Sequence, residues 1–483
     1  MTGTGSWRKP MVVLSMSLLA AIWTTTLAVE MASASAPSLA RATPAVDPDA
    51  TFTAVACPAP ASCFTVGHYA TTSGGVSGVV ETPNGLAWKA VEVNLPANSA
   101  SPPAYYPNFI TCSSKRSCLV LGTYRDTSGA TQGLIETMTN GAWTDLEAPL
   151  PSGAAPSPAV AIAPDAACSA AGACVIVGTY DDSAGSTEGL IDTLTGSTWS
   201  SAEAPKPPRA LNSGLTSVTC STSTSCTAVG SFTTTTGYNA PSTGFLETLN
   251  RGTWTAKTLP RPAGTKEPVV SAIACPSTTE CIGVGTLQQG TSTVRGLIET
   301  VSGTHWVPVQ AAEPPSSGGN WELTGVSCPA VGDCVAVGNY YDTSGNAREY
   351  ADVLAAGVWT ASELPIPPNE IAEPSVYEPA PFAVVACSTA TKCVAAGDFT
   401  DVGRVARVFL EVDTSGSWKE SQAVLPDSYT GQLGYLEAIG CAVSSDCLAV
   451  GSYTQSAEEG VTQIEGFADY VKGLSSIAYQ LPL

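Results

Sequence analysis

The sequence predicts an all-β protein: an eight-bladed β-propeller of four-stranded antiparallel blades, with one hairpin disulfide per blade. Three observations support this. Charged residues make up only 13% of the 483 residues, while glycine and proline number 45 and 36, a composition poor in helix formers. Cysteine pairs recur at one fixed spacing along the chain. Each recurring unit also contains four short runs of β-type residues separated by turn residues.

The repeat is defined by its cysteines, which form eight pairs separated by six positions and recurring every 52 to 59 residues. A glycine follows the second cysteine by four residues in every copy, from Gly67 to Gly451. An acid follows eighteen residues after that cysteine, or slightly later, and in seven copies a tryptophan lies seven residues beyond the acid. The cysteine pairs are Cys57/Cys63, Cys112/Cys118, Cys168/Cys174, Cys220/Cys226, Cys275/Cys281, Cys328/Cys334, Cys387/Cys393 and Cys441/Cys447.

The fifth copy illustrates the four strands that each repeat predicts. They are "VVSAIAC" (269–275), "CIGVGTL" (281–287), "RGLIETV" (295–301) and "HWVPVQ" (305–310). Four strands per repeat of about 55 residues favour a propeller over a β-solenoid, whose coils are usually shorter. The expected repeats are about 51–96, 106–151, 160–205, 214–260, 269–314, 322–365, 381–426 and 435–483, and the last strand does not share a blade with the first.

The N-terminal segment indicates secretion. Arg8 and Lys9 precede an apolar run, and "ASA" at 32–34 supplies small residues for cleavage. We expect a signal peptide over 1–34 and a flexible segment over 35–50, with an uncleaved membrane anchor as the alternative. The mature chain is then extracellular, in an environment where disulfides persist.

The cysteine pairs allow three interpretations. Zinc sites usually combine C-x2-C units or add histidine, but this chain has only His68 and His305. Redox catalysis favours C-x-x-C over five intervening residues. A disulfide across the first hairpin of each blade fits the spacing, so we predict eight structural disulfides, each worth roughly 2 kcal/mol in the chain-entropy model. We expect no metal and no cofactor.

The acid and the tryptophan recur in the blades, whereas a catalytic group is normally needed once. The eight acids could suggest the paired carboxylates of glycoside hydrolysis, but the recurrence favours a structural role in which they accept hydrogen bonds. The tryptophans are expected to pack between neighbouring blades. The acids are Glu81, Glu136, Asp192, Glu247, Glu299, Asp352, Glu411 and Asp469, and the tryptophans are Trp88, Trp143, Trp199, Trp254, Trp306, Trp359 and Trp418.

Charge restricts the partners. The formal net charge of −21 reflects a shortage of lysine and arginine, so nucleic acid and anionic membrane surfaces are poor partners. We expect a monomer that does not associate with the membrane once the signal peptide is removed. An extracellular glycan or protein remains the plausible partner.

Candidate binding residues lie in the loops between the second and third strands and in the connections between blades. These share one face around the central channel, whereas the disulfides and the tryptophan hairpins are expected on the opposite face. Variable loops on a rigid scaffold often bind ligands; the alternative is that their aromatic residues pack on the blades. The "DTSG" turns do not match the ligand spacing of a calcium loop. The candidate aromatics are Tyr105, Tyr106, Trp321, Tyr341, Tyr377, Tyr429 and Tyr435, interleaved with Asp126, Asp181, Asp182, Asp342, Glu370, Glu373 and Glu378.

The stretches "ETLNRGTW", "ETVSGTHW" and "EVDTSGSW" resemble the hairpin of Asp-box, or BNR-like, propeller repeats found in sialidases, although the turn aspartate is missing in nearly every copy. The pattern CxxxxxCxAVG is similar to a propeller repeat of secreted actinobacterial proteins of uncharacterised function. A sialidase-like fold implies an enzyme with three converging arginines, for which Arg125, Arg295, Arg348 and Arg404 are the candidates. We expect instead a non-enzymatic binding module, with a sialidase-like or other polysaccharide-active glycosidase or lyase as the alternative and a purely structural surface protein third.

Overall fold

The chain divides after Pro44, and the second unit is Ala45–Leu483. A computed structural model describes residues of the second unit only, so the expected signal peptide lies outside the described residues. The described ranges are 49–84, 87–168, 173–237, 240–302, 305–371, 384–389, 391–413, 417–423, 434–442, 447–456, 462–472 and 475–481. No helix able to cross a membrane is found within these ranges.

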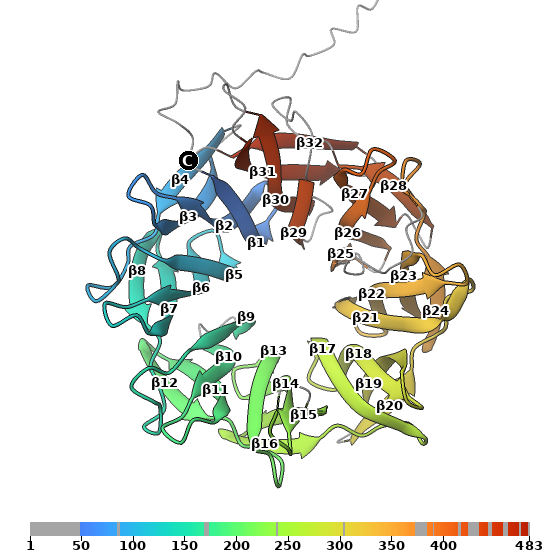
Figure 1. The fold of residues 1–483 in the computed structure, drawn as a ribbon, viewed down its shortest axis with the longest axis horizontal. Coiled ribbons are helices and arrows are strands. Elements are labelled where there is room, and N and C mark those ends of the chain that lie inside the picture. Colours follow the sequence, from blue (N-terminus) through green and yellow to red (C-terminus); the bar gives the residue numbers. More distant parts are fainter. Residues whose placement is uncertain are drawn as a thin grey trace, which may run out of the picture. The chain divides into compact units, whose positions relative to one another are not determined.

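The second unit is an eight-bladed β-propeller, which confirms the predicted fold class. Each blade is a four-stranded antiparallel sheet whose strands follow chain order, and the first strand of each blade lies nearest the centre of the ring (Figure 1). Blades 1 to 4 contain β1 (Ala50–Ala59), β2 (Ser62–Ala70), β3 (Val76–Asn84), β4 (Ala87–Glu92); β5 (Tyr105–Ser114), β6 (Ser117–Arg125), β7 (Thr131–Thr139), β8 (Ala142–Glu147); β9 (Ala161–Cys168), β10 (Cys174–Asp181), β11 (Thr187–Thr195), β12 (Thr198–Glu203); and β13 (Asn212–Thr222), β14 (Ser225–Thr233), β15 (Ser242–Asn250), β16 (Thr253–Thr258).

Blades 5 to 8 repeat the same arrangement. They contain β17 (Thr265–Ser277), β18 (Glu280–Gln289), β19 (Thr293–Ser302), β20 (His305–Gln310); β21 (Ser317–Ala330), β22 (Asp333–Asp342), β23 (Ala347–Ala355), β24 (Val358–Glu363); β25 (Val384–Thr389), β26 (Lys392–Thr400), β27 (Ala406–Asp413), β28 (Trp418–Gln422); and β29 (Gly434–Cys441), β30 (Cys447–Ser456), β31 (Thr462–Lys472), β32 (Ser475–Gln480). In blade 5 the four predicted runs are all strands, and the first three extend beyond the predicted ends.

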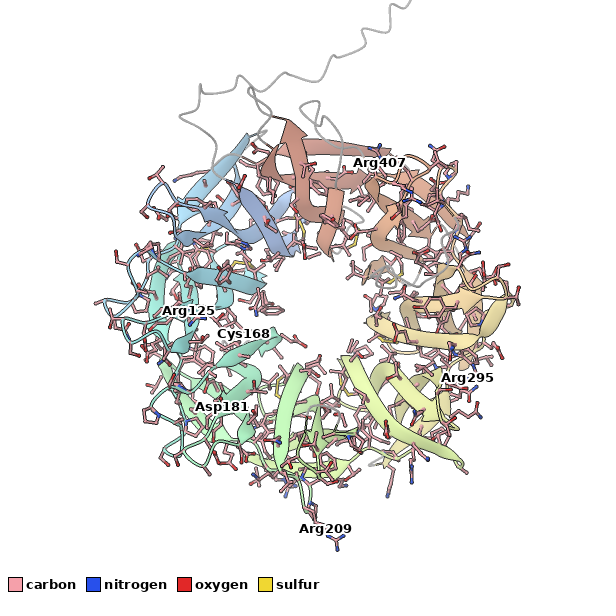
Figure 2. All side chains as sticks on the ribbon, in the orientation of Figure 1. Arg125, Cys168, Asp181, Arg209, Arg295 and Arg407 are labelled. Carbon is pink, nitrogen blue, oxygen red and sulfur yellow. A yellow bond between two sulfur atoms is a disulfide. The ribbon has the colours of Figure 1, made fainter. Side chains whose placement is uncertain are left out.

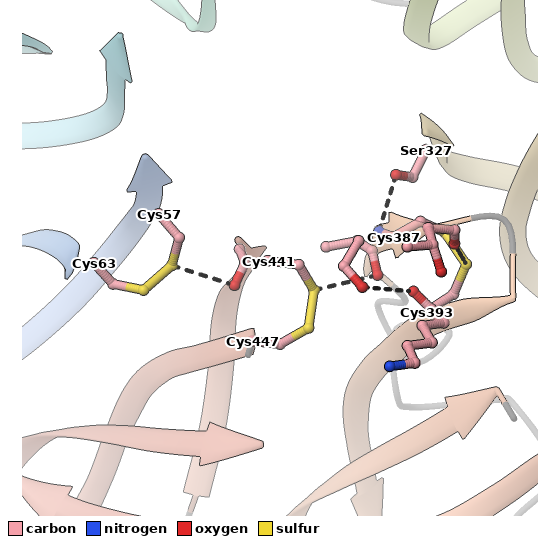
Figure 3. Close-up of a disulfide and its surroundings, with 12 residues drawn as sticks. Cys57, Cys63, Ser327, Cys387, Cys393, Cys441 and Cys447 are labelled. Atoms are coloured by element: carbon pink, nitrogen blue, oxygen red, sulfur yellow. Dashed lines mark hydrogen bonds between the residues drawn. A yellow bond between two sulfur atoms is a disulfide. The ribbon is translucent and has the colours of Figure 1, made fainter. Parts of the chain in front are cut away.

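The eight disulfides form as predicted, each across the first hairpin of its blade, with Cα atoms 4.0 to 4.2 Å apart. Two of them also contact the preceding blade. The Sγ atom of Cys57 lies 3.4 Å from the carbonyl oxygen of Gly440, and Cys441 Sγ lies 3.5 Å from that of Ala386 (Figure 3). Each of these two disulfides therefore reinforces its own hairpin and also packs against the neighbouring blade.

The disulfides are also more buried than their position in a hairpin suggests, which the sequence did not predict. In every pair the first cysteine is half-buried, whereas the second, at the start of the second strand, is buried. All but one of the second cysteines belong to apolar clusters between blades, so these sulfur atoms are core atoms as well as cross-links. The buried cysteines are Cys63, Cys118, Cys174, Cys226, Cys281, Cys334, Cys393 and Cys447, with exposed fractions of 0 to 8%.

The core is divided among the interfaces between blades. The described residues form one cluster of buried apolar side chains at each of the eight interfaces. Every one of the seven repeated tryptophans belongs to the cluster that its blade shares with the preceding blade; Trp88, for example, packs with Leu448 and Val450 of blade 8. This confirms that the tryptophans pack between blades.

The ring closes without a shared strand, because β1 begins blade 1 and β32 ends blade 8. Side-chain packing replaces the missing covalent and sheet connection. The ring of Phe52 lies directly against Gly466, where an added Cβ would come within 2.1 Å of Phe52 Cδ2. In addition, the Ile464 N–H donates to Asp49 Oδ1 at 2.9 Å. Phe52 therefore packs directly across the interface that closes the ring.

We expect Phe52→Ala to cost about 3–5 kcal/mol, the usual range for a buried phenylalanine, and to loosen the interface between blades 8 and 1 first. Hydrogen exchange should show faster exchange in β1 and β31 together. Leu215→Ala is the control, because Leu215 occupies the same register position in blade 4, opposite Gly230, as Phe52 does opposite Gly67. Equal loosening of β1 in both variants would contradict a special closing role for Phe52.

Candidate functional site

The loops between the second and third strands form tight turns that an aspartate holds. Asp126 accepts hydrogen bonds from the backbone N–H groups of Ser128 and Ala130, at 2.8 and 3.0 Å. Asp182, Asp342 and Asp401 make the same pair of bonds with the residues two and four positions later. Side-chain hydrogen bonds from Ser128 and Gln132 lower the Asp126 pKa to about 2. These aspartates are turn residues.

The connections between blades lie on the same face as these turns and are bonded to them. In blade 2, Thr127 N–H donates to the Asn98 carbonyl at 2.8 Å, and Ala100 N–H donates to that of Arg125 at 2.8 Å. In blade 7, Val402 N–H donates to the Asn369 carbonyl at 2.8 Å. The two sets of loops therefore meet on one face, as the strand order predicts. Within the described ranges, no group of three or more His, Cys, Asp or Glu side chains is placed to hold a metal ion.

Two of the candidate aromatics are interior residues, so their assignment to an exposed rim is wrong. Tyr105 is 0% exposed and Trp321 is 2% exposed. Each packs on a glycine in the third strand of the preceding blade: an added Cβ would lie 2.3 Å from Tyr105 Cε1 at Gly78 and 3.0 Å from Trp321 Cδ1 at Gly296. The Tyr105 hydroxyl also donates to Glu136 Oε1. Both side chains join blades rather than face solvent.

Two other candidates are exposed at equivalent positions of the inner strands. Tyr106 in β5 is 47% exposed and Tyr435 in β29 is 42% exposed. Blade 1 lies between their blades, and there the equivalent residue, Thr51, pairs with His68. The His68 ring contacts the Tyr106 ring edge to face, with centroids 5.2 Å apart. We call His68, Tyr106 and Tyr435 the aromatic arc.

The remaining candidates are less informative. Tyr341 is half-buried at the end of β22, beside the Asp342 turn. Tyr377 and Tyr429 lie outside the described residues.

Within the aromatic arc, burial lowers the pKa of His68, and its Nδ1 atom is buried without a hydrogen-bond partner among the described residues. The His68 imidazole is therefore neutral at physiological pH.

The arginines do not converge. Arg125, Arg295 and Arg407 lie on different blades around the ring (Figure 2), and the candidate arginines have local partners. Arg125 donates to the Gly129 carbonyl, Arg295 stacks on Trp321 with 4.0 Å between its Cζ atom and the ring centroid, and Arg348 forms ion pairs with Asp342 and Glu370. The described arginines therefore do not form the three-arginine site that a sialidase-like mechanism requires.

The eight repeated acids are all buried, between 0 and 3% exposed, but five of them do not accept the hydrogen bonds that we expected. Glu136 accepts from Tyr105, and Asp352 accepts from the Ala312 N–H at 3.0 Å. Within the described residues, neither carboxyl oxygen has a partner in Glu81, Asp192, Glu247, Glu299 and Glu411. Burial raises the pKa to about 9 for Glu81, about 8 for Glu136, Glu247, Glu299 and Glu411, about 7 for Asp192 and about 6 for Asp352.

A second repeated pair was missed in the sequence. The Tyr124 hydroxyl donates to Glu147 Oε2 at 2.6 Å, and that of Tyr180 donates to Glu203 Oε2 at 3.2 Å. The signal was present: a tyrosine lies six residues after the second cysteine and a glutamate lies four residues after the tryptophan in the same copies. These pairs tie the second strand to the fourth within a blade and are structural.

The described chain is thus a disulfide-reinforced eight-bladed propeller. No protein-family model matches the sequence, and no curated protein matches it. Among solved structures, the chain is similar to the BP39L lectin from Burkholderia pseudomallei, with 11% identity, covering 90% of this chain and 99% of the lectin at a TM-score of 0.43.

Two further structures are similar to about the same extent. An ulvan lyase has 9% identity, covering 77% of this chain and 95% of the lyase, with a TM-score of 0.43. The β-propeller domain of the Trilobed protease from Pyrococcus furiosus has 10% identity, covering 76% and 95%, with a TM-score of 0.39. Similarities this low assign no ligand and no reaction to this chain.

Proposed function

We propose that the mature chain is a secreted, non-enzymatic binding module that recognises an extracellular glycan or protein partner through the aromatic arc. The observation that carries this proposal is the exposure of Tyr106 and Tyr435 at equivalent positions of β5 and β29. Exposed tyrosines supply a rigid apolar face and a hydroxyl at low entropic cost, which suits both sugar stacking and protein recognition.

The scaffold supports recognition because it holds these side chains in place. Tyr106 lies on the strand that carries Cys112 of the Cys112–Cys118 disulfide, and Tyr435 lies on the strand that carries Cys441. Rigid presentation reduces the entropy lost on binding. A binding role also agrees with Arg125, Arg295 and Arg348, which are engaged with their own partners, whereas the sialidase-like alternative needs such arginines to converge.

The test is a screen of the mature protein against glycan and extracellular-protein arrays, followed by affinity measurements with the strongest hits. We expect Tyr106→Ala combined with Tyr435→Ala to weaken binding at least about tenfold, equivalent to about 1.4 kcal/mol. Val358→Ala is the control, since Val358 is an exposed apolar residue in a different hairpin. Unchanged affinity in the double variant would remove the arc as the binding site.

A further inference from the structure

A groove lies between blades 2 and 3, away from the aromatic arc. Its volume is about 450 Å³, which falls within the range of roughly 300–1,000 Å³ typical of small-molecule sites. Its walls come from the disulfide hairpins of both blades and from the turns between their third and fourth strands, whereas the arc lies at the start of the inner strands. It is therefore a separate candidate site.

The lining of the groove carries no ionisable side chain, although the protein as a whole has a formal net charge of −21. Six hydroxyl groups line it and make no side-chain hydrogen bond within the described residues: those of Thr111, Ser113, Ser117, Thr137, Thr139 and Ser197. A charged ligand would find no counter-charge among the lining residues, and a purely apolar ligand would leave these hydroxyls without partners.

Apolar surface faces the same space. Leu146, which is 46% exposed, and Trp199 line the groove beside the hydroxyls. Trp199 is fixed by packing into the cluster between blades 2 and 3, and Cys118, Cys168 and Cys174 of the two disulfides form part of the wall. A ligand with both a hydrocarbon face and several hydroxyls matches this combination, and the rigid walls lower the cost of binding it.

The corresponding position in blade 4 is different. There, the Thr248 hydroxyl is 3.1 Å from the Thr255 hydroxyl, so the two satisfy each other. In blade 2, Thr144 donates to the Thr137 carbonyl at 3.2 Å, as Thr255 does to the Thr248 carbonyl in blade 4, but the Thr137 hydroxyl itself has no partner among the described residues.

We propose that this groove is a binding site for an uncharged saccharide, such as the end of a neutral hexose oligomer, with sugar hydroxyls on the threonine and serine side chains and the sugar's C–H face against Leu146 and Trp199. This site does not depend on the proposed function of the arc.

Saturation-transfer NMR and tryptophan fluorescence titration with glucose, galactose, mannose and N-acetylglucosamine, and with short oligomers of each, provide the test. We expect at least one neutral sugar to bind, and Thr137→Val with Thr139→Val to weaken it about tenfold, since each lost hydrogen bond is worth about 0.5–1.5 kcal/mol. Thr248→Val is the matched control in blade 4 and should leave the affinity unchanged.

Three outcomes would overturn the proposal: no neutral sugar binds, glucuronic acid binds as tightly as glucose, or the threonine variants with wild-type melting temperatures keep full affinity. Tyr106→Ala with Tyr435→Ala should leave sugar binding in the groove unchanged. A loss of that binding in the tyrosine variant would place the sugar at the arc and contradict the groove.

Discussion

Gly338→Ala is expected to destabilise the propeller by about 3 kcal/mol or more, since it forces a methyl group into a packed position. A Cβ at Gly338 would lie 1.8 Å from the carbonyl oxygen of Glu322 and 2.8 Å from the Leu323 Cα. The close approach arises because β21 contains a bulge between Leu323 and Gly325, directly opposite Gly338. A backbone carbonyl cannot move aside as a side chain can, so the strand pair itself must shift.

The same contact explains why this glycine recurs. At Gly67, Gly230, Gly285 and Gly451, a Cβ would come within 2.0 to 2.1 Å of the carbonyl oxygen in the bulged first strand. Chemical denaturation of Gly338→Ala and of Gly153→Ala provides the measurement. Gly153 has no atom within 4 Å of an added Cβ, so its variant should unfold close to wild type. Indistinguishable unfolding midpoints for the two variants would contradict the bulge explanation.

The propeller is expected to be most stable near pH 4–5 and to lose stability as the pH rises towards 9. The buried acids have folded-state pKa values raised by burial, to about 9 for Glu81 and about 8 for Glu247 and Glu299. Between their unfolded value, about 4.3, and these folded values, the unfolded chain releases protons that the folded chain keeps. Unfolding is therefore increasingly favoured as the pH rises through that window.

The opposite sign applies to the turn aspartates. Hydrogen bonds from the side chains of Ser128 and Gln132 lower the Asp126 pKa to about 2, so its contribution is present above about pH 3.9 and is lost as the pH falls through 2. The two effects together place the maximum in mildly acidic solution.

Denaturant unfolding at pH 4.5, 6 and 8.5 measures this dependence. Glu81→Gln, which replaces the carboxyl by a neutral amide, should reduce the loss of stability between pH 4.5 and 8.5, while Glu313→Gln, on an exposed connection, should not. A wild-type protein that is more stable at pH 8.5 than at 4.5 would show that the buried carboxyls are ionised in the folded state.

The fold was predictable from sequence because the residues that define it repeat. The spacing of Cys328, Cys334 and Gly338 is the same in all eight repeats, so a single structural interpretation had to fit every repeat. The placement of Trp321 was not predictable in this way. Its neighbours, rich in Pro, Ser and Gly, indicate a connection, but β21 begins at Ser317. The Trp321 side chain packs against Gly296 in another blade, and no pattern in the sequence around Trp321 predicts that contact.

The burial of the disulfides could not be predicted from the sequence for the same reason. The spacing of Cys63 from Cys57, or of Cys393 from Cys387, predicts a bond across a hairpin, but it does not show what covers the sulfur atoms. That cover comes from the neighbouring blade, as it does for Cys57 at the Gly440 carbonyl. The pairing of cysteines within a repeat was therefore predictable, whereas their burial between neighbouring blades was not.

The repeated acids show a further limit. Their recurrence predicts a structural role, but hydrogen bonding depends on what the preceding blade presents. Ala312 offers an N–H to Asp352, whereas Glu299 finds no donor among the described residues. By contrast, the pairs of Tyr124 with Glu147 and Tyr180 with Glu203 could have been predicted from their spacing, because both partners belong to one repeat.

The central claim is that residue types that recur in the blades build the ring, whereas the exposed Tyr106 and Tyr435, whose position carries threonine in blade 1, are left for binding. Differential scanning calorimetry of Tyr106→Ala with Tyr435→Ala tests it most directly. Because surface substitutions rarely change stability by more than about 0.5 kcal/mol, we predict a melting temperature within about 1 °C of wild type. A decrease of several degrees would contradict the claim, since it would show that these tyrosines are packing residues of the blades.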